Sequence, residues 1–181
     1  MKSIFLFLGI ILSLISISEA QEAAVLRVGD DAPSFTLPYA TKDSIARVRL
    51  RLDTITTSKR VLIAFYPADW SSGCTKEFCV MRDNLAQLSD LKVELLAISG
   101  DYIFSHHEWA KANNFSFKLL SDHDHAVARK YNSYNHESGY NKRTVYLVDI
   151  GGKISYIDLN YSVSDDRSFK KLRAAIEGVP K

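Results

Sequence analysis

Continuous apolar runs alternate along the chain with stretches in which apolar side chains recur every three or four residues. Residues 61–66, 93–98 and 144–148 are runs with the length and composition of buried strands. After the first run, apolar positions over residues 73–89 recur at spacings of four and three, which predicts an amphipathic helix with one buried stripe. The pattern therefore favours a fold in which strands and helices alternate.

The remaining predicted elements continue this alternation. In chain order they are a helix over about residues 103–113, a short strand at 117–120, a helix over about 125–131, a strand at 154–159 and a C-terminal helix with the apolar stripe Phe169, Leu172 and Ile176. Turn residues at 149–153 join the last two strands into a predicted β-hairpin. Strand–helix–strand–helix followed by a hairpin and a helix is the order of a thioredoxin-like α/β fold, a mixed β-sheet flanked by helices on both faces. No repeat, low-complexity tract or linker interrupts residues 21–181, so we expect one such domain.

Arginine and apolar residues alternate over residues 46–52, which predicts a strand with one basic and one apolar face. The arginines are Arg47, Arg49 and Arg51. A phosphate-binding role is one interpretation of them, and a solvated strand face is the interpretation that we favour.

The N-terminal segment has the pattern of an export signal. Lys2 precedes an apolar run over residues 4–17, and Ser18-Glu19-Ala20 puts small residues at the two positions that a signal peptidase reads. We expect residues 1–20 to be a signal peptide cleaved near Ala20, which would leave the mature chain periplasmic or extracellular and free of the membrane. A retained membrane anchor is the alternative, although the run is shorter than the about 20 residues that a span needs.

The composition is that of a globular protein. The chain has 181 residues, 46% of them hydrophobic, and a formal net charge of +2. This length suits one domain with a substantial core. A charge so near neutral gives no reason to expect nucleic acid or an anionic surface as a partner.

Both cysteines, Cys74 and Cys79, lie in the segment that follows the strand at 61–66. In an exported protein an even number of cysteines commonly forms a structural disulfide. However, residues five apart on an α-helix have Cα atoms about 8.6 Å apart, whereas a disulfide rarely tolerates more than about 7 Å. A bond between the two cysteines would require the first turn of the helix to unwind, which suits a redox switch better than a permanent crosslink.

Cys74 has the features of a nucleophile. It lies on the inward stripe at the start of the helix, where unpaired N–H groups and the positive end of the helix favour the thiolate over the thiol. Cys79 is turned about 140° away, toward the flank of the helix. We therefore interpret Cys74 as a nucleophile and Cys79 as its resolving partner.

The residues around Cys74 resemble those of a known family. Pro67, Ser71 and Cys74 match the peroxiredoxin pattern of a proline, a hydroxyl residue four positions on and a cysteine seven positions on. The segment 74–79, with Arg82-Asp83 behind it, is similar to the bacterioferritin-comigratory or PrxQ-like branch of the AhpC/TSA superfamily, in which the resolving cysteine lies five residues after the peroxidatic one. The likeness also covers residues 29–38, 98–101, 119–122 and 143–153.

The resemblance implies a thiol-dependent peroxidase that reduces hydrogen peroxide and organic hydroperoxides. It makes Cys74 the peroxidatic nucleophile and Arg143 the active-site arginine that favours the thiolate. It implies that the Ser71 hydroxyl bonds the sulfur or the peroxide, and that Pro67 limits the loop and shields the site from water. Glu77 matches the family's acidic residue that orients the arginine, and complementarity to the helix dipole is the alternative interpretation.

The same resemblance implies how the catalytic cycle closes. Cys74 becomes a sulfenic acid, Cys79 condenses with it to an intramolecular disulfide, and a thioredoxin-like protein reductant, itself exported, restores both thiols. No cofactor or metal is expected, and we expect a monomer or weak dimer. The sequence departs from the family at Ser71-Ser72-Gly73, where threonine or Thr-Pro-Gly is more frequent. Serine keeps the hydroxyl but lacks the β-branch that restricts it, which bears on the rate rather than on the function.

Two other functions fit parts of the sequence. An exported thioredoxin-like thiol-disulfide oxidoreductase would share the fold. However, members of that class share a Cys-x-x-Cys motif that faces a cis-proline. Here the spacing is Cys-x4-Cys and no proline lies near Thr144. A non-catalytic exported binding module would instead use a Cys74–Cys79 disulfide as a passive crosslink.

Histidines offer a further alternative, a zinc or copper site. We do not favour it, because neighbouring histidines on a helix point to different faces and surface histidines are common. The five histidines are His106, His107, His123, His125 and His136.

Overall fold

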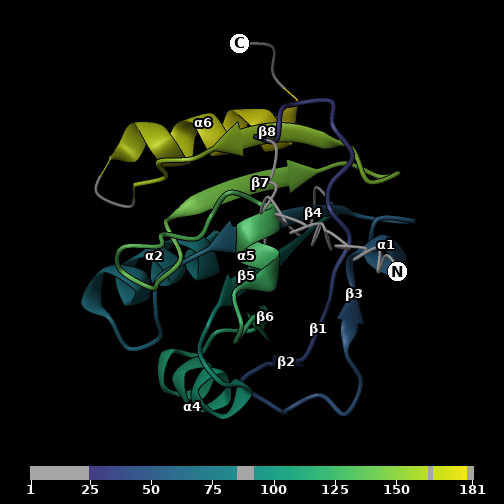
Figure 1. Ribbon diagram of the computed structural model, residues 1–181. Coiled ribbons are helices and arrows are strands. Elements are labelled where there is room, and N and C mark those ends of the chain that lie inside the picture. The colour runs from purple at the N-terminus through teal and green to yellow at the C-terminus, as the bar shows by residue number, and fades with distance from the viewer. Residues whose placement is uncertain (1–24, 85–91, 163–164, 179–181) are drawn as a thin grey trace, which may run out of the picture.

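The structure is a computed structural model that describes residues 25–84, 92–162 and 165–178 (Figure 1). The predicted signal peptide lies outside the described residues, and so does the part of the predicted helix at 73–89 beyond residue 84. Among the described residues, no helix combines the length and the apolar character needed to cross a membrane.

A six-stranded mixed sheet forms the middle layer, with the strand order β2-β6-β5-β4-β7-β8 (Figure 1). The three neighbours β6, β5 and β4 are parallel, whereas β2, β7 and β8 run antiparallel to the strands beside them. The strands of this sheet are β2 Tyr39–Ala40, β4 Arg60–Phe65, β5 Val93–Ser99, β6 Lys118–Ser121, β7 Thr144–Val148 and β8 Ile154–Asp158. Because β4, β5 and β6 are parallel, their carboxyl ends meet at one edge of the sheet.

The central strand β4 explains why its sequence is continuously apolar. Its side chains alternate between the two faces of the sheet, and both faces are covered. Leu62 and Ala64 are buried in one core cluster, while Val61, Ile63 and Phe65 are buried in a second cluster on the other face.

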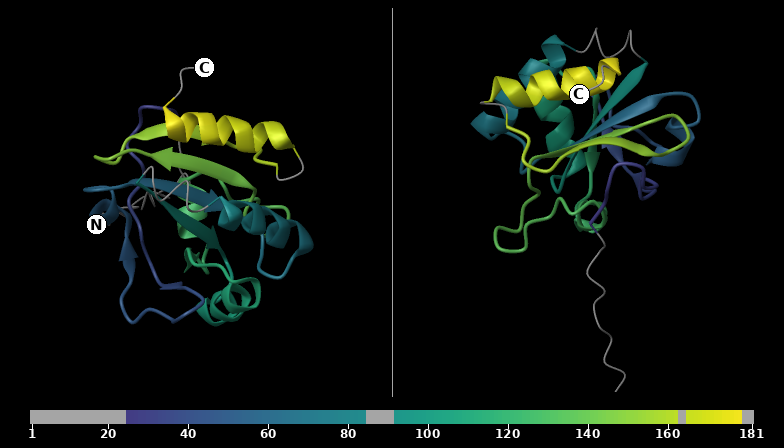
Figure 2. Two further views of the ribbon diagram at one scale, coloured as in Figure 1. Left: turned by 180° about the vertical axis from the view of Figure 1, so that it is seen from behind. Right: turned by 90° about the horizontal axis from the view of Figure 1, so that it is seen from above.

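Helices cover both of these faces. The described helices are α1 Leu52–Ile55, α2 Ser72–Asp83, α4 Ile103–Asn113, α5 Ala126–Lys130 and α6 Asp166–Glu177. α2, α4 and α6 bury side chains in the cluster of Leu62, and Figure 2 shows α2 and α6 on the same side of the sheet. α1 and α5 pack into the cluster of Val61, together with the small sheet of β1 (Thr36–Leu37) and β3 (Leu50–Arg51). The predicted α/β architecture, with helices on both faces of a mixed sheet, is confirmed.

Most predicted elements agree with the structure to within one residue at each end, including the helix at 103–113 and the hairpin of β7 and β8. The strand predicted over residues 46–52 is wrong for most of its length. Only Leu50 and Arg51 form a strand, and α1 begins at Leu52. Val48, which the alternation assigns to a buried apolar face, is 70% exposed, so no such face is covered at that point. Leu52 instead enters the core as the first residue of a helix, where its carbonyl accepts a hydrogen bond from the Thr56 hydroxyl.

Candidate active site

The loop after β4 leads directly into α2 and fixes the position of Cys74. Ser71 is the N-cap of α2, with an extended backbone (φ −69°, ψ 138°), and its hydroxyl oxygen accepts a hydrogen bond from the Cys74 N–H at 3.2 Å. The Thr75 hydroxyl donates to the Ser71 carbonyl at 3.0 Å, so the first turn is held by side chains as well as by the backbone. Cys74 is thus the third residue of the helix, beside the N–H groups at its positive end.

Arg143 reaches the sulfur of Cys74 from the neighbouring strand. It directly precedes β7, and β7 pairs with β4 so that Thr144 lies opposite Phe65, close to the start of the loop. Its Nη2 donates to the Cys74 Sγ at 3.2 Å, and its Nη1 donates to the Glu77 carboxylate. The predicted proximity of Arg143 to Cys74 is therefore present in the structure.

Burial and mutual contact shift the pKa values of the charged residues beside Cys74. Cys74 and Glu77 are buried, with 0% and 1% of their surface exposed. Burial raises the pKa of Glu77 to about 7, although the positive charge and hydrogen bond of Arg143 oppose that rise. Burial would lower the pKa of Arg143, but the charges of Glu77 and Cys74 outweigh it and the pKa of the guanidinium rises. Arg143 consequently stays cationic beside the sulfur.

The sequence left two interpretations of Glu77, orientation of Arg143 and complementarity to the helix dipole. Its position in the structure bears on both. It lies in the second turn of α2, beyond the first turn within which the helix dipole acts strongly. Its Oε2 pairs with Arg143, while its Oε1 is buried and has no hydrogen-bond partner among the described residues. The carboxylate is therefore directed at the arginine.

Cys79 lies on the same helix and is half-buried, and both cysteines are free thiols. Between them, the ring of Phe78 packs against Tyr66, Trp109 and Phe117, with centroid distances of 4.8, 5.9 and 5.5 Å. With both cysteines in regular helix, the helical geometry that separates their Cα atoms by about 8.6 Å applies. The two sulfurs cannot bond without a change in α2.

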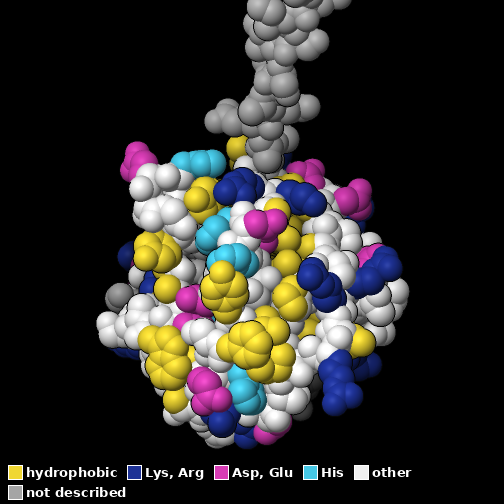
Figure 3. All heavy atoms as spheres, turned by 60° about the horizontal axis from the view of Figure 1, so that its bottom comes forward, with side chains coloured by type: hydrophobic (Ala, Val, Ile, Leu, Met, Phe, Trp, Pro, Cys, Tyr) yellow, Lys and Arg dark blue, Asp and Glu magenta, His cyan; other side chains and the backbone are white. Residues whose placement is uncertain are grey.

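The loop itself contains Pro67, which follows β4 by two residues and is half-buried, and Trp70, which is 56% exposed. Figure 3 shows a molecular face on which exposed hydrophobic side chains lie among histidines and charges of both signs. Because Trp70 is exposed, the loop reaches the surface, whereas the Cys74 thiol that follows it is buried.

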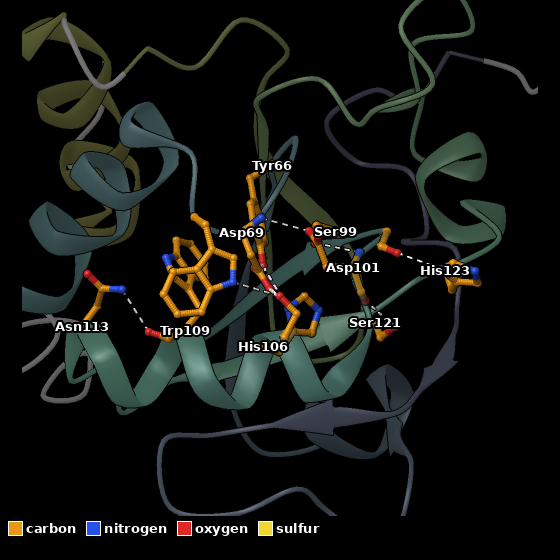
Figure 4. Close-up of polar contacts among 12 residues, drawn as sticks. Tyr66, Asp69, Ser99, Asp101, His106, Trp109, Asn113, Ser121 and His123 are labelled. Atoms are coloured by element: carbon orange, nitrogen blue, oxygen red, sulfur yellow. Dashed lines mark hydrogen bonds and ion pairs between the residues drawn. The ribbon is translucent and has the colours of Figure 1, made fainter.

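The sequence did not reveal a buried polar cluster beneath this loop. His106 and Asp69 form a hydrogen-bonded pair in which neither side chain is exposed, with His106 Nδ1 2.9 Å from Asp69 Oδ2 (Figure 4). The assumption that the histidines lie at the surface is wrong for His106. Its spacing of three and four residues from buried Trp109 and Ala110 was the available signal. Within the described part of the chain, no group of three or more histidine, cysteine, aspartate or glutamate side chains could hold a metal ion.

A free thiol at a helix N-terminus, in contact with a guanidinium and set at the edge of a sheet with helices on both faces, defines a thiol-based redox protein. The model of the AhpC/TSA family matches residues 28–157. Peroxiredoxin Bcp of Escherichia coli K12 is 31% identical over 146 residues, which cover 77% of this chain and 90% of that protein. A bcp peroxiredoxin of Coxiella burnetii is 36% identical over 138 residues, covering 73% of this chain and 87% of the relative. The chain belongs to the AhpC/TSA family of peroxiredoxins, in its Bcp-like branch.

Solved structures give the same result. Peroxidoxin BcpB of Mycobacterium tuberculosis superimposes with a TM-score of 0.74 and 26% identity, covering 86% of this chain and 99% of that one. The reduced 2-Cys peroxiredoxin of Plasmodium vivax has a TM-score of 0.75 and 27% identity, covering 84% of this chain and 81% of that one. The thioredoxin-like fold is confirmed, and family membership identifies the chain as a thiol peroxidase, an oxidoreductase.

Proposed function

We propose that this protein reduces hydrogen peroxide and organic hydroperoxides through the thiolate of Cys74. The observation that supports this most directly is the 3.2 Å contact between Arg143 Nη2 and the buried Cys74 Sγ at the N-terminus of α2. A cationic donor and a helix end both favour a sulfur that carries negative charge. The thiolate is the form that attacks a peroxide oxygen.

In the first step the sulfur electron pair forms an S–O bond to one peroxide oxygen. The O–O bond breaks, the other oxygen leaves with the bonding electrons and takes up a proton, and the products are a Cys74 sulfenic acid and water or an alcohol. Arg143 is placed to stabilise the charge that develops on the oxygens. The Ser71 oxygen accepts a hydrogen bond from the Cys74 N–H, so its own hydrogen would be available to donate to the peroxide or the sulfur. Pro67, half-buried in the loop, would limit the access of water.

In the second step Cys79 resolves the sulfenic acid. Its sulfur forms an S–S bond with Cys74 and one water molecule leaves. Because the helix separates the two cysteines, α2 must unwind locally for this step. A thioredoxin-like dithiol protein then reduces the disulfide and becomes oxidised in turn, which restores both thiols.

The proposal includes export, which the lysine and apolar run of residues 1–20 support. An exported enzyme cannot meet a cytosolic reductant, so its thioredoxin-like partner would be exported as well. N-terminal sequencing of the protein recovered from its host tests this part, because the mature chain would begin near Gln21. A chain that retained Met1 would contradict it.

The activity is tested by peroxide consumption with a dithiol reductant, using the wild type, Cys74→Ser and Cys79→Ser, with mass spectrometry of the oxidised thiols. Cys74→Ser should abolish turnover and stay folded. Cys79→Ser should still form the sulfenic acid but turn over slowly with a dithiol protein. Peroxide consumption by Cys74→Ser at the wild-type rate would refute the assignment of the nucleophile, and faster reduction of insulin than of peroxide would favour a disulfide oxidoreductase.

A further inference from the structure

The Asp69 carboxylate is the centre of a buried cluster under the loop that precedes Cys74 (Figure 4). Its Oδ1 lies 2.7 Å from the Tyr66 hydroxyl, at the end of β4. Its Oδ2 lies 2.7 Å from the Ser105 hydroxyl and 2.9 Å from Nδ1 of His106, both on α4. One carboxylate therefore joins the loop to a helix more than thirty residues further along the chain.

The proton positions in this cluster follow from its chemistry. A carboxylate only accepts hydrogen bonds, so both hydroxyls and His106 Nδ1 donate to Asp69. Burial, followed by the charge of Asp69, raises the pKa of Tyr66 well above its ordinary value, so the phenol retains its proton. The other ring nitrogen, His106 Nε2, is buried and has no hydrogen-bond partner among the described residues. Because a buried nitrogen without a hydrogen-bond partner is destabilising, stability alone does not explain why His106 lies here.

The backbone of Asp69 is hydrogen-bonded on both sides of the peptide that leads into α2. The Asp69 N–H donates to Asp101 Oδ2 at 2.9 Å, and the Asp69 carbonyl accepts from the Ser71 N–H at 2.8 Å. Between these two bonds, Trp70 adopts the left-handed conformation with φ +61°, which is uncommon for a large side chain. Its indole N–H donates to the hydroxyl of Ser105 at 3.1 Å, the same hydroxyl that donates to Asp69. Such a conformation persists only where its surroundings hold it on several sides.

We propose that Asp69 and His106 are positioning residues for the peroxidatic thiol. By holding the Trp70 backbone, they direct the Ser71 cap at the N–H of Cys74 and keep the sulfur within reach of Arg143. Neither residue contacts the sulfur in the structure, so their effect passes through the loop. This inference rests on the proposed function, since it presumes that Cys74 is the group that attacks peroxide.

The test uses the full chain in a Cys79→Ser background, which isolates the first step. The variants are Asp69→Asn, which keeps the shape of the side chain, His106→Leu, which removes the donor, and His106→Asn, which restores a donor near the position of Nδ1. The control is His107→Leu on the adjacent, half-buried residue, whose Nδ1 lies 2.8 Å from the Thr41 carbonyl oxygen, away from the Asp69 cluster. The rate constant for oxidation of Cys74 by hydrogen peroxide is measured at a temperature where every variant is folded, together with the pH profile of Cys74 alkylation.

Asp69→Asn and His106→Leu should lower the rate constant by roughly 10- to 100-fold, the cost of displacing reacting groups by about 1 Å. Both should also move the alkylation profile to higher pH. His106→Asn should recover most of the rate, and His107→Leu should stay within about twofold of the parent. If Asp69→Asn and His106→Leu are folded and oxidise Cys74 at the parent rate, the cluster is only structural and the inference is wrong. If His106→Leu does not fold, a folded Asp69→Asn that reacts at the parent rate is enough to overturn it. If the parent itself does not react with peroxide, the proposed function fails and the inference fails with it.

Discussion

A Cβ atom built on Gly73 would lie 3.0 Å from Nη2 of Arg143, the nitrogen that donates to the Cys74 sulfur. That separation is tighter than nine in ten real contacts of a Cβ atom. The guanidinium therefore occupies the space that a side chain at position 73 would need. A side chain at position 73, directly before Cys74, would require the guanidinium to shift by a few tenths of an ångström.

Gly73→Ala should accordingly lower activity without loss of stability. Alanine at a helical position is favoured over glycine by up to about 1 kcal/mol, so the unfolding midpoint should be unchanged or higher. The displaced arginine should slow oxidation of Cys74 by roughly tenfold. Stopped-flow oxidation and thermal unfolding of Gly73→Ala, compared with Ser72→Ala at the exposed neighbouring position, check this expectation. Equal oxidation rates in the two variants would show that the guanidinium can move aside freely.

Removal of Arg143 should have a larger effect. Arg143→Ala takes away a donor to the Cys74 sulfur, which under the proposed function would also face the incoming peroxide. The loss of one such donor costs about 100- to 1000-fold in other enzymes. The pH profile of Cys74 alkylation should move to higher pH, since less thiolate is stabilised. Lys142→Ala, at the exposed adjacent residue, is the control. A profile that stays in place would mean that the helix end alone holds the charge.

Ser71 should contribute to stability and to catalysis separately. Ser71→Ala removes the N-cap of α2 and should reduce the free energy of unfolding by about 0.5–2 kcal/mol. Ser71→Thr keeps the cap and adds a β-branch, so its stability should match that of the wild type and its oxidation rate should equal or exceed it. Urea unfolding and peroxide kinetics of both variants measure the two contributions. A slower Ser71→Thr would show that the loop is adapted to serine.

Glu77 should make stability depend on pH in a defined direction. Its pKa is raised in the folded protein from 4.5 to about 7, so the protonated form is the one that folding favours. Relative to a variant without this carboxyl, the wild type should lose roughly 3 kcal/mol of stability as the pH rises from about 4.5 to about 7.

Urea unfolding of the wild type and Glu77→Gln at pH 5 and pH 8 measures this difference. Relative to the wild type, the free energy of unfolding of Glu77→Gln should be higher at pH 8 than at pH 5. Lys76→Gln, on the exposed side of the same helix, should show no such change. A constant difference at both pH values would indicate that the pair with Arg143 keeps Glu77 ionised throughout.

Local patterns in the sequence were sufficient for most of the fold. The run at 61–66 reads as a buried strand because a central strand covered on both faces needs apolar side chains at every position. Cys74 was assigned to the inward stripe of its helix from spacing alone, and it is buried. The strand at 46–52 failed because alternation indicates only a possible apolar face, and whether anything covers that face depends on distant parts of the chain.

The site was predictable in part. Cys74, Ser71 and Glu77 lie within one segment, and Arg143 was located through family resemblance rather than through any local pattern. The contact of His106 with Asp69 joins residues 37 positions apart, and it depends on how α4 packs beside the loop. No property of the isolated segments specifies that packing.

Placing both cysteines on one helix has a consequence for recognition. Phe78 lies between them in the sequence, and its ring packs against four aromatic rings from outside α2. A bond between the two sulfurs would require α2 to unwind locally, and it would disturb the packing of the Phe78 ring. The reduced and oxidised molecules would then present different shapes, so a reductant could distinguish them before any sulfur is exchanged.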